Sequence, residues 1–370
     1  MKAVLPTTKL TNVINGMADK KTILNVAILG TGNIGTDLMV KALRSPFLDC
    51  TLFAGRNLTS AGMTKANSLG VRVSALGVES IMKDPDCCDL VFDATSAIDH
   101  KYHWSLLEKM GKIVIDMTPS RVGEMCIPAI NLDSCLKYKN VNMVTCGGQA
   151  SIPMAHLIGL LHQEVDYIEV ISSIASRSAG PATRINIDEY VETTEEGIKI
   201  FSGCKRSKVM LILNPAHPPI DMQTTVFAKV KKPDIQKLNA AAVDMARQIQ
   251  AYVPGYQLIV PPVLENKRIV IMVKIQGLGD YLPKFAGNLD IINCAAIAMA
   301  EEYAKNSRSA PIRASAKNNY TIWLVLWSVY CVASTGTYPL ICTGGCALHT
   351  NQNTAQSGAI IFCRVPGKMG

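Results

Sequence analysis

The sequence has little of what marks secreted, membrane-embedded or nucleic-acid-binding proteins. Only 18% of its 370 residues are charged, and the net charge of +8 comes from scattered basic side chains. Because no run of Lys and Arg alternates with aromatic residues, we do not expect nucleic acid as a partner. The one membrane-like stretch, residues 321–333, is too short to span a bilayer comfortably, so we expect no membrane association.

The cysteines also lack a pattern. The twelve cysteines form no Cys-x-x-Cys pair, and neither they nor any Asp, Glu and His set shows metal-ligand spacing. We therefore expect free thiols in a reducing compartment and no metal. Residues 1–20 are polar and lack the apolar core of a secretory signal, which favours a cytoplasmic protein. The modest positive charge describes either a solvated surface or one that attracts phosphorylated ligands such as dinucleotides and coenzyme A.

What is present is an alternation of short apolar runs with helical patterns. It predicts an α/β fold with a doubly wound parallel sheet covered by helices on both faces. Its strands are expected at residues 25–29, 51–54, 90–94, 112–117 and 142–145.

Longer strand patterns follow and indicate an α+β second part. They lie at residues 165–173, 209–213, 225–230 and 268–275. One amphipathic helix starts after Asp234 and runs to about Tyr252, and a last helix is expected at residues 288–305.

A glycine-rich loop follows the first predicted strand and opens a helix; it reads Gly30-Thr31-Gly32-Asn33-Ile34-Gly35. In such loops the first glycine permits a tight turn, the second lets backbone approach a pyrophosphate, and the third lets helix and strand pack closely. The helix N-terminus offers free N–H groups to the phosphates. The placement favours dinucleotide binding over a tight turn without ligand.

The acidic residue that usually binds the ribose 2′-hydroxyl, about 20 residues after such a loop, is missing. Ala54-Gly55-Arg56-Asn57 stands there instead. Arg56 would stack on adenine or pair with a 2′-phosphate, unless it is an ordinary surface arginine. We expect NAD as cofactor, with NADP accepted.

The sharpest motif follows the last predicted strand of the first sheet and reads Thr145-Cys146-Gly147-Gly148-Gln149-Ala150. We expect the strand to end at Thr145 and a helix to start near Ser151, which would cap it, with Pro153 in its first turn. Cys146 would then lie between the carboxyl edge of a sheet and a helix N-terminus, where ligands bind and the pKa of a thiol is lowered. The pattern alone leaves open a reactive thiolate or a packed cysteine.

Further segments belong with this motif. They are Ser178-Ala179-Gly180-Pro181-Ala182-Thr183-Arg184, Asn186-Ile187-Asp188-Glu189, Asp93-Ala94-Thr95-Ser96-Ala97 and Ala286-Gly287-Asn288-Leu289-Asp290. Together with the glycine loop they resemble the acetaldehyde dehydrogenase (acylating) family over residues 25 to about 305.

The resemblance implies a fold like that of aspartate-semialdehyde dehydrogenase, with a Rossmann domain and a second, dimerising domain. It implies that Cys146 forms a thioester with acetaldehyde or another short aldehyde, with NAD(P) as oxidant and coenzyme A as co-substrate. It implies a homodimer and a partner, the 4-hydroxy-2-oxovalerate aldolase of aromatic meta-cleavage pathways.

The resemblance also implies residue roles. Asn186 and Ile187 would border the aldehyde pocket. Cofactor contacts are implied for Thr31, Gly32, Asn33, Ile34, Ser178, Ala179, Gly180, Pro181, Ala182, Thr183, Arg184, Ile185, Asn186 and Asn288.

The chain departs from the family in several places. Better-known members carry an Asp near the cysteine where this chain has Thr224, and Asp221 is displaced from that place. Arg56 replaces an acid found in several members, and residues after 310 have no recognised counterpart. These departures leave the identity of a general base open.

Two other functions fit the same residues. One is a phosphorylating semialdehyde dehydrogenase or acyl-phosphate reductase, which takes phosphate and usually a histidine base; yet no histidine lies next to Cys146 in sequence. The other is a non-catalytic dinucleotide-sensing protein with an inert cysteine.

These features divide the chain into five expected parts. They are an N-terminal extension (1–22), a dinucleotide-binding domain (23–145), a catalytic and dimerisation domain (146–287), a terminal helix returning to the first domain (288–310) and an atypical tail (311–370) that we expect to be poorly ordered.

Overall fold

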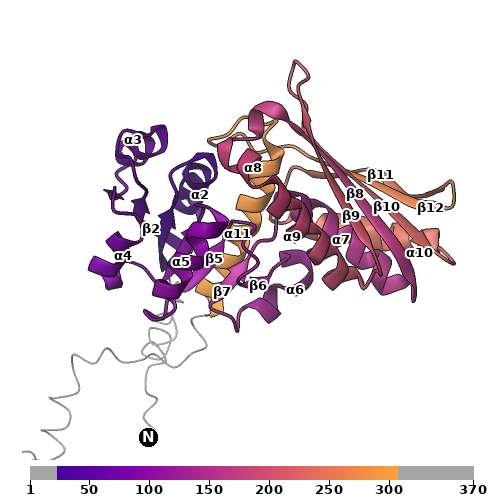
Figure 1. Cartoon of the computed structure of the whole chain (residues 1–370), viewed down its shortest axis with the longest axis horizontal. Coiled ribbons are helices and arrows are strands. Elements are labelled where there is room, and N and C mark those ends of the chain that lie inside the picture. Colours follow the sequence, from indigo (N-terminus) through magenta and orange to yellow (C-terminus); the bar gives the residue numbers. More distant parts are fainter. Residues whose placement is uncertain (1–22, 307–370) are drawn as a thin grey trace, which may run out of the picture. The chain divides into compact units, whose positions relative to one another are not determined.

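Seven short parallel strands form the first sheet of the computed structural model, which describes residues 23–306 of the chain, with backbone only for Pro181 and Ala182 (Figure 1). The spatial order is β3-β2-β1-β4-β5-β7-β6. The strands are β1 (Leu24–Leu29), β2 (Leu48–Ala54), β3 (Val73–Ser74), β4 (Leu90–Asp93), β5 (Ile113–Asp116), β6 (Glu124–Met125) and β7 (Asn140–Asn142).

Helices cover both faces of this sheet and explain why its central strands are mostly apolar. All four residues of β4 are buried, for example, because each face packs against its own core. The connecting helices are α2 (Asn33–Arg44), α3 (Ala61–Ser68), α4 (Glu79–Lys83), the 3₁₀ turn η2 (Pro85–Cys87), α5 (Ala97–Leu107) and α6 (Pro128–Cys135).

The second sheet has five longer strands in the order β11-β12-β10-β8-β9. Its neighbours are antiparallel except β8 and β9, so the sheet is mixed. The strands are β8 (Val165–Ala175), β9 (Ser207–Asn214), β10 (Met222–Val230), β11 (Tyr256–Glu265) and β12 (Arg268–Ile275).

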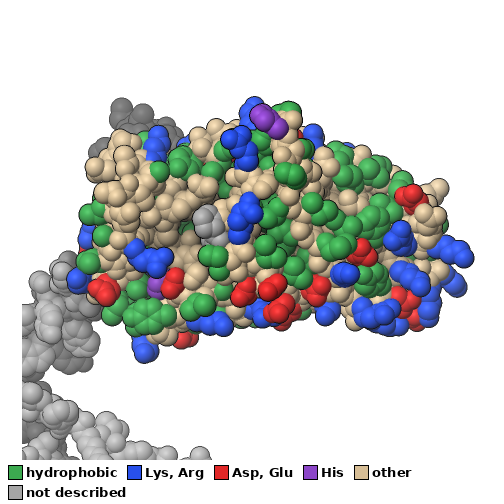
Figure 2. All heavy atoms as spheres, turned by 45° about the horizontal axis from the view of Figure 1, so that its top comes forward, with side chains coloured by type: hydrophobic (Ala, Val, Ile, Leu, Met, Phe, Trp, Pro, Cys, Tyr) green, Lys and Arg blue, Asp and Glu red, His purple; other side chains and the backbone are tan. Residues whose placement is uncertain are grey.

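Three helices pack on one face of the second sheet, and no other helix of residues 23–306 covers its second face. They are α7 (Cys146–Leu161), α9 (Ile187–Ser202) and α10 (Ile235–Gln250); η3 (Ser176–Ser178) and α8 (Pro181–Ile185) lead into α9. The uncovered face carries Ile171, Met210 and Thr225, which share one register position and are only partly buried. Ile212, two residues after Met210 and on the same face of β9, is 48% exposed. Green hydrophobic side chains are frequent on this part of the surface in Figure 2.

The last described helix, α11 (Gly287–Asn306), packs against the first sheet although it follows the second in sequence (Figure 1). Its apolar residues, including Ile292 and Met299, share a core with Val26 and Phe53. Both ends of the described chain therefore contribute to one core.

Most expected elements are present, with one difference near the cysteine motif and one in the second sheet. The doubly wound sheet and the α+β second part are confirmed, and Asp234 caps α10 by accepting a hydrogen bond from the Lys237 amide. The strand expected at residues 142–145 is wrong: β7 ends at Asn142. β11, with two prolines, was not predicted.

The extension (1–22) and the tail from 311 lie outside the described residues. No helix within residues 23–306 is long and apolar enough to cross a bilayer.

Candidate active site

The glycine loop joins β1 to α2 and is shaped by close backbone contacts. Gly30 has φ +100°, and a Cβ there would lie 2.4 Å from the Ala94 carbonyl oxygen. A Cβ on Gly35 would lie 1.8 Å from the carbonyl oxygen of Gly30. A Cβ on Gly32, by contrast, would meet nothing within 4 Å, and Gly32 caps α2 without a side-chain hydrogen bond. The first turn of α2 therefore offers open backbone N–H groups, which suits a phosphate.

The loop after β2 lies beside the glycine loop. A Cβ on Gly55 would lie 2.6 Å from the methyl carbon of Thr31, so the two loops touch. Arg56 follows at the surface and is exposed. No carboxylate lies between Ala54 and Ser60, so this edge offers a cation and hydroxyl groups to the adenosine end of a dinucleotide.

A pocket opens where the parallel strands of the first sheet end. The chain segments that follow β4, β5 and β7 all contribute to it, as do α2, α9 and α11. This is the carboxyl edge at which open α/β sheets bind ligands, and the strand order reverses there between β1 and β4. The lining residues are Ile34, Ala94, Thr95, Ser96, Met117, Thr118, Pro119, Val144, Thr145, Cys146, Thr183, Asn186, Tyr190, Asn288, Leu289 and Ile292.

Cys146 is the first residue of α7 and is half-buried in this pocket. Thr145 is the N-cap: its hydroxyl accepts a hydrogen bond from the Gly148 amide at 2.9 Å and pairs with Thr194 of α9 at 2.7 Å. The expectation that Ser151 caps this helix was wrong, since Ser151 lies inside α7 and its hydroxyl donates to the Gly147 carbonyl. Cys146 is therefore closer to a helix N-terminus than the sequence indicated.

Burial has the largest influence on the ionisation of Cys146. It raises the pKa of the thiol to about 11, although the Tyr190 hydroxyl and the backbone N–H groups of Gly147 and Cys146 lower it. The lowered pKa expected from the helix N-terminus is thus wrong, because burial destabilises the thiolate more than these hydrogen-bond donors stabilise it.

Asn288, at the start of α11, lines the same pocket as Cys146. It is 1% exposed, and neither its amide nitrogen nor its amide oxygen has a hydrogen-bond partner within the described part of the chain. An unpartnered buried amide is costly, so a ligand that supplies both a donor and an acceptor fits this position. The carboxamide of nicotinamide is such a group.

The segment 178–187 contributes only part of what was predicted. Thr183 and Asn186 line the pocket, whereas the side chain of Ser178 is buried and donates to the Ala175 carbonyl. Arg184 folds back on its own loop and donates to Ser176 and Ala179. Four further members with described side chains do not line the pocket: Ala179 is buried, Gly180 and Ile187 are half-buried, and Ile185 is 79% exposed. Contacts of these residues with a ligand stay predictions.

Tyr190 was missed by the sequence analysis. It lies four residues after Asn186 and therefore on the same side of α9, and that spacing was the available signal. Thr118 and Pro119, after β5, were also missed.

A buried carboxylate and two histidines lie next to the pocket lining. Asp93, at the end of β4, accepts hydrogen bonds from His100 and His103 at 3.0 and 2.9 Å. Although burial opposes ionisation, these two histidines lower the pKa of Asp93 well below its ordinary value. Thr95 donates to the other oxygen of the same carboxylate, so this group fixes a residue of the lining.

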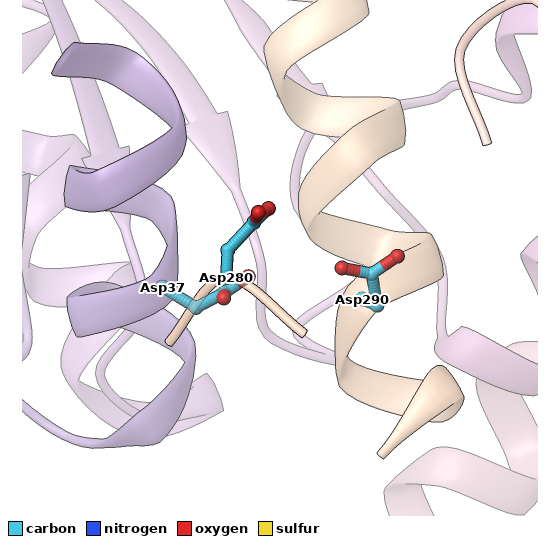
Figure 3. Close-up of side chains that lie close together, drawn as sticks. All are labelled: Asp37, Asp280 and Asp290. Carbon is cyan, nitrogen blue, oxygen red and sulfur yellow. The ribbon is translucent and has the colours of Figure 1, made fainter. Parts of the chain in front are cut away.

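Three aspartates meet near the pocket, on α2, on the loop before α11 and on α11 (Figure 3). The carboxylates of Asp37, Asp280 and Asp290 lie close enough to share a cation. Lys41 already supplies one: its Nζ lies 2.9 Å from Asp37, 2.9 Å from Asp280 and 2.7 Å from Asp290. Lys41 and the three aspartates therefore form a cluster of ion pairs that joins α2 to α11, which we call the latch. Asp290 lies two residues after Asn288 in sequence.

Comparison with known proteins gives consistent results. A family described as prokaryotic acetaldehyde dehydrogenase, dimerisation, matches residues 146–283. An acetaldehyde dehydrogenase of Pectobacterium atrosepticum is 59% identical over 280 residues, which cover 75% of this chain and 95% of that protein. One of Spirochaeta aurantia is 58% identical over 282 residues, covering 76% and 95%.

Two solved structures share the fold. Aspartate semialdehyde dehydrogenase II from Vibrio cholerae, complexed with ASA, aligns with a TM-score of 0.53 at 15% identity, covering 78% of this chain and 100% of that one. The Candida albicans enzyme with NADP aligns with a TM-score of 0.53 at 10% identity, covering 75% and 99%.

Proposed function

The chain belongs to the acetaldehyde dehydrogenase family, and we propose that it oxidises acetaldehyde, or another short aldehyde, to an acyl-coenzyme A through a thioester on Cys146. The observation that carries this proposal is the convergence of Cys146, Asn288 and the start of α2 on one pocket. A nucleophile, a buried amide and a phosphate-binding turn are the parts that this reaction needs.

The residues present fit a nicotinamide dinucleotide. The open N–H groups after Gly32 would hold the pyrophosphate, and the unpartnered amide of Asn288 would hold the nicotinamide carboxamide. When bound, the nicotinamide supplies a hydride acceptor beside the cysteine. Arg56 would face the adenosine end, where NADP carries its extra phosphate.

In the first chemical step the sulfur of Cys146 attacks the aldehyde carbon and forms a tetrahedral hemithioacetal. The oxyanion needs donors that are not already in use. The Gly148 amide is taken by Thr145. The backbone N–H groups of Cys146 and Gly147 face the sulfur before attack and become free when the sulfur loses its charge, so they are the candidates. Loss of hydride from the former carbonyl carbon then leaves a thioester on Cys146.

Coenzyme A completes the cycle as a second thiol. Its thiolate attacks the thioester carbonyl, the bond to Cys146 breaks, and the acyl group leaves as acyl-coenzyme A while the cysteine thiolate is restored. No histidine lines the pocket, so the base that the phosphorylating alternative usually employs is absent from this lining. Family membership also favours coenzyme A over phosphate as acceptor.

We expect Cys146→Ser to reduce turnover with acetaldehyde, NAD and coenzyme A by at least about a thousandfold, because a serine hydroxyl is a far weaker nucleophile at neutral pH. Formation of the reduced cofactor and of acyl-coenzyme A measures it. Cys87→Ser is the matched control, since Cys87 is half-buried but lies outside the pocket. Full activity of Cys146→Ser, or acyl transfer to phosphate alone, would contradict the proposal.

A homodimer is the expected assembly. The matched family segment is described as a dimerisation region, and it contains the whole uncovered face of the second sheet. Partly exposed Ile171, Met210 and Ile212 would be covered by a second copy. An aldolase partner and a role in aromatic catabolism remain predictions of the family resemblance.

A further inference from the structure

The Tyr190 side chain reaches from the first turns of α9 to the backbone next to Cys146. It is 6% exposed and lines the same pocket as the cysteine. A Cβ placed on Gly147 would lie only 1.9 Å from the Tyr190 hydroxyl and 3.2 Å from the Ser172 hydroxyl. Both hydroxyl groups therefore lie directly over the residue that follows the cysteine.

The Tyr190 hydroxyl has no well-formed hydrogen bond within residues 23–306, although the Cys146 thiol and the Ser172 hydroxyl lie beside it. A buried hydroxyl left in this state costs about 1–3 kcal/mol, so its presence calls for a functional reason. A negatively charged sulfur on Cys146 would supply the missing acceptor.

The side chains that surround Tyr190 carry neutral hydroxyl groups. Ser172 on β8 and Thr224 on β10 are register partners, and their hydroxyls are 2.9 Å apart. Thr194 donates to the Tyr190 carbonyl at 2.7 Å and fixes that turn of α9. Thr224 stands where related enzymes were expected to carry an acid, so the chain of side chains behind Cys146 is uncharged.

The charged groups near the pocket do not reach the sulfur. Among the lining residues only Cys146 and Tyr190 have ionisable side chains. Asp93, His100 and Asp116 lie behind the lining and interact with one another. Ionisation of Cys146 therefore depends on hydrogen-bond donors rather than on a nearby positive charge.

We propose that Tyr190 is a catalytic residue that donates its hydroxyl hydrogen bond to the sulfur of Cys146 whenever that sulfur is ionised. Ser172 and Thr224 act as positioning residues that hold the tyrosine hydroxyl. This inference rests on the proposed role of Cys146 as nucleophile and extends it, because it names the group that makes the thiolate attainable.

The ionisation behaviour of the pair agrees with this assignment. Burial, with the adjacent thiolate, raises the pKa of Tyr190 well above its ordinary value, so the hydroxyl stays protonated and remains a donor. After burial, the Tyr190 hydroxyl has the largest influence on Cys146 and lowers its pKa.

The test is the pH dependence of Cys146 alkylation by iodoacetamide, followed by peptide mass spectrometry in the full chain without substrates. Losing a hydrogen bond to a charged group costs about 1.5–3 kcal/mol, which corresponds to roughly one to two pH units. We expect Tyr190→Phe to move the alkylation profile to higher pH by that amount and to slow labelling at pH 8 by roughly 10- to 100-fold. Turnover should fall in parallel.

Tyr256→Phe is the matched control. Tyr256 is equally buried, but its hydroxyl donates to the Ala150 carbonyl at 3.0 Å, away from the thiol. Its variant should keep the wild-type alkylation profile. Retained cofactor binding, read from nicotinamide fluorescence, separates a local effect from misfolding.

An unshifted profile in Tyr190→Phe would overturn the inference. If that variant does not fold, Thr224→Val must shift the profile upward by a smaller amount, and no shift there also overturns it. Failure of the proposed function looks different: Cys146→Ser would then keep its turnover, whatever Tyr190 does to alkylation.

Discussion

Cys146 is subject to two opposing influences on its ionisation. The start of a helix stabilises an adjacent negative charge by at most about 2 kcal/mol, or roughly one to two pH units. Burial acts more strongly and raises the pKa of the thiol to about 11. The resting cysteine is therefore mostly a neutral thiol at pH 7, and a neutral thiol reacts slowly with oxidants and alkylating agents.

Arg56 is expected to decide how well NADP is used. It is exposed directly after β2, and no carboxylate between Ala54 and Ser60 would repel a 2′-phosphate. Arg56→Ala should lower kcat/KM for NADP by roughly tenfold and leave that for NAD within about twofold, because only NADP carries the group that an exposed arginine would pair with. Steady-state kinetics with both cofactors measure it.

Arg72→Ala is a suitable control for Arg56, since Arg72 is also exposed but pairs with Asp84. The Arg72→Ala variant should leave kcat/KM unchanged for both NAD and NADP. Equal losses for NAD and NADP in Arg56→Ala would mean that Arg56 acts on the loop itself and not on the phosphate.

Single residues could be predicted where a local motif defines their role. Cys146 and the glycines of the first loop follow from motifs that lie next to predicted strands, and the family resemblance added Asn288. The spacing from Asn186 could place Tyr190 on the same side of α9, but its contact with Cys146 could not be predicted, because that contact joins two helices about 44 residues apart in sequence. Such a contact depends on how α7 and α9 pack, which no local spacing specifies.

At the scale of elements, the start of α7 shows how local preference can mislead. Gly147 and Gly148 predict a loop, because glycine is unfavourable inside a helix by roughly 1 kcal/mol. The structure nevertheless begins the helix at Cys146, with Thr145 as cap. A side chain at either glycine would collide, with Tyr190 in one case and Val144 in the other. Packing against α9 and against the preceding segment therefore explains both glycines.

The latch between α2 and α11 gives a prediction about stability. Lys41→Met removes the buried cation from Asp37, Asp280 and Asp290 and should cost about 3–5 kcal/mol of the free energy of unfolding. The uncompensated carboxylates would have raised pKa values in the folded variant. Their protonation should therefore restore part of the stability as the pH falls from 7 towards 5. Urea unfolding at several pH values measures both effects.

Arg44→Gln is the matched control for the latch. Arg44 also pairs with Asp280, but its side chain is 54% exposed, so its loss should cost no more than about 1 kcal/mol. Comparable losses in the two variants would show that the ion pairs of Lys41 contribute no more to stability than a surface ion pair does.

At the scale of the whole molecule, strand order explains why residues from distant segments form one site. The first sheet could be predicted from alternating apolar runs, since its strands are buried on both faces. β11 could not, because Pro261 and Pro262 interrupt its pattern and are tolerated only at a sheet edge. The strand order of the second sheet depends on pairing between segments far apart in sequence, so no local sequence pattern predicts it.

The uncovered face of the second sheet predicts the oligomeric state. Ile171→Glu places a charge at the centre of this face, where burial against a second copy would be costly. We expect the wild type to be a dimer and this variant to shift to monomer by at least about tenfold in dissociation constant, as measured by sedimentation equilibrium. Lys65→Glu, on the exposed surface of α3, should leave the dimer intact. An unchanged dimer in both variants would move the interface elsewhere.

The position of α11 has a consequence for the order in which the protein is made. Translation produces the nucleotide loop and Cys146 long before Asn288, so a nascent chain carries the thiol before the site beside it is complete. The core shared by β1 and α11 closes only after residue 306 has left the ribosome. Competence for hydride transfer is therefore acquired only after α11 has been synthesised, well after the nucleotide loop and the thiol.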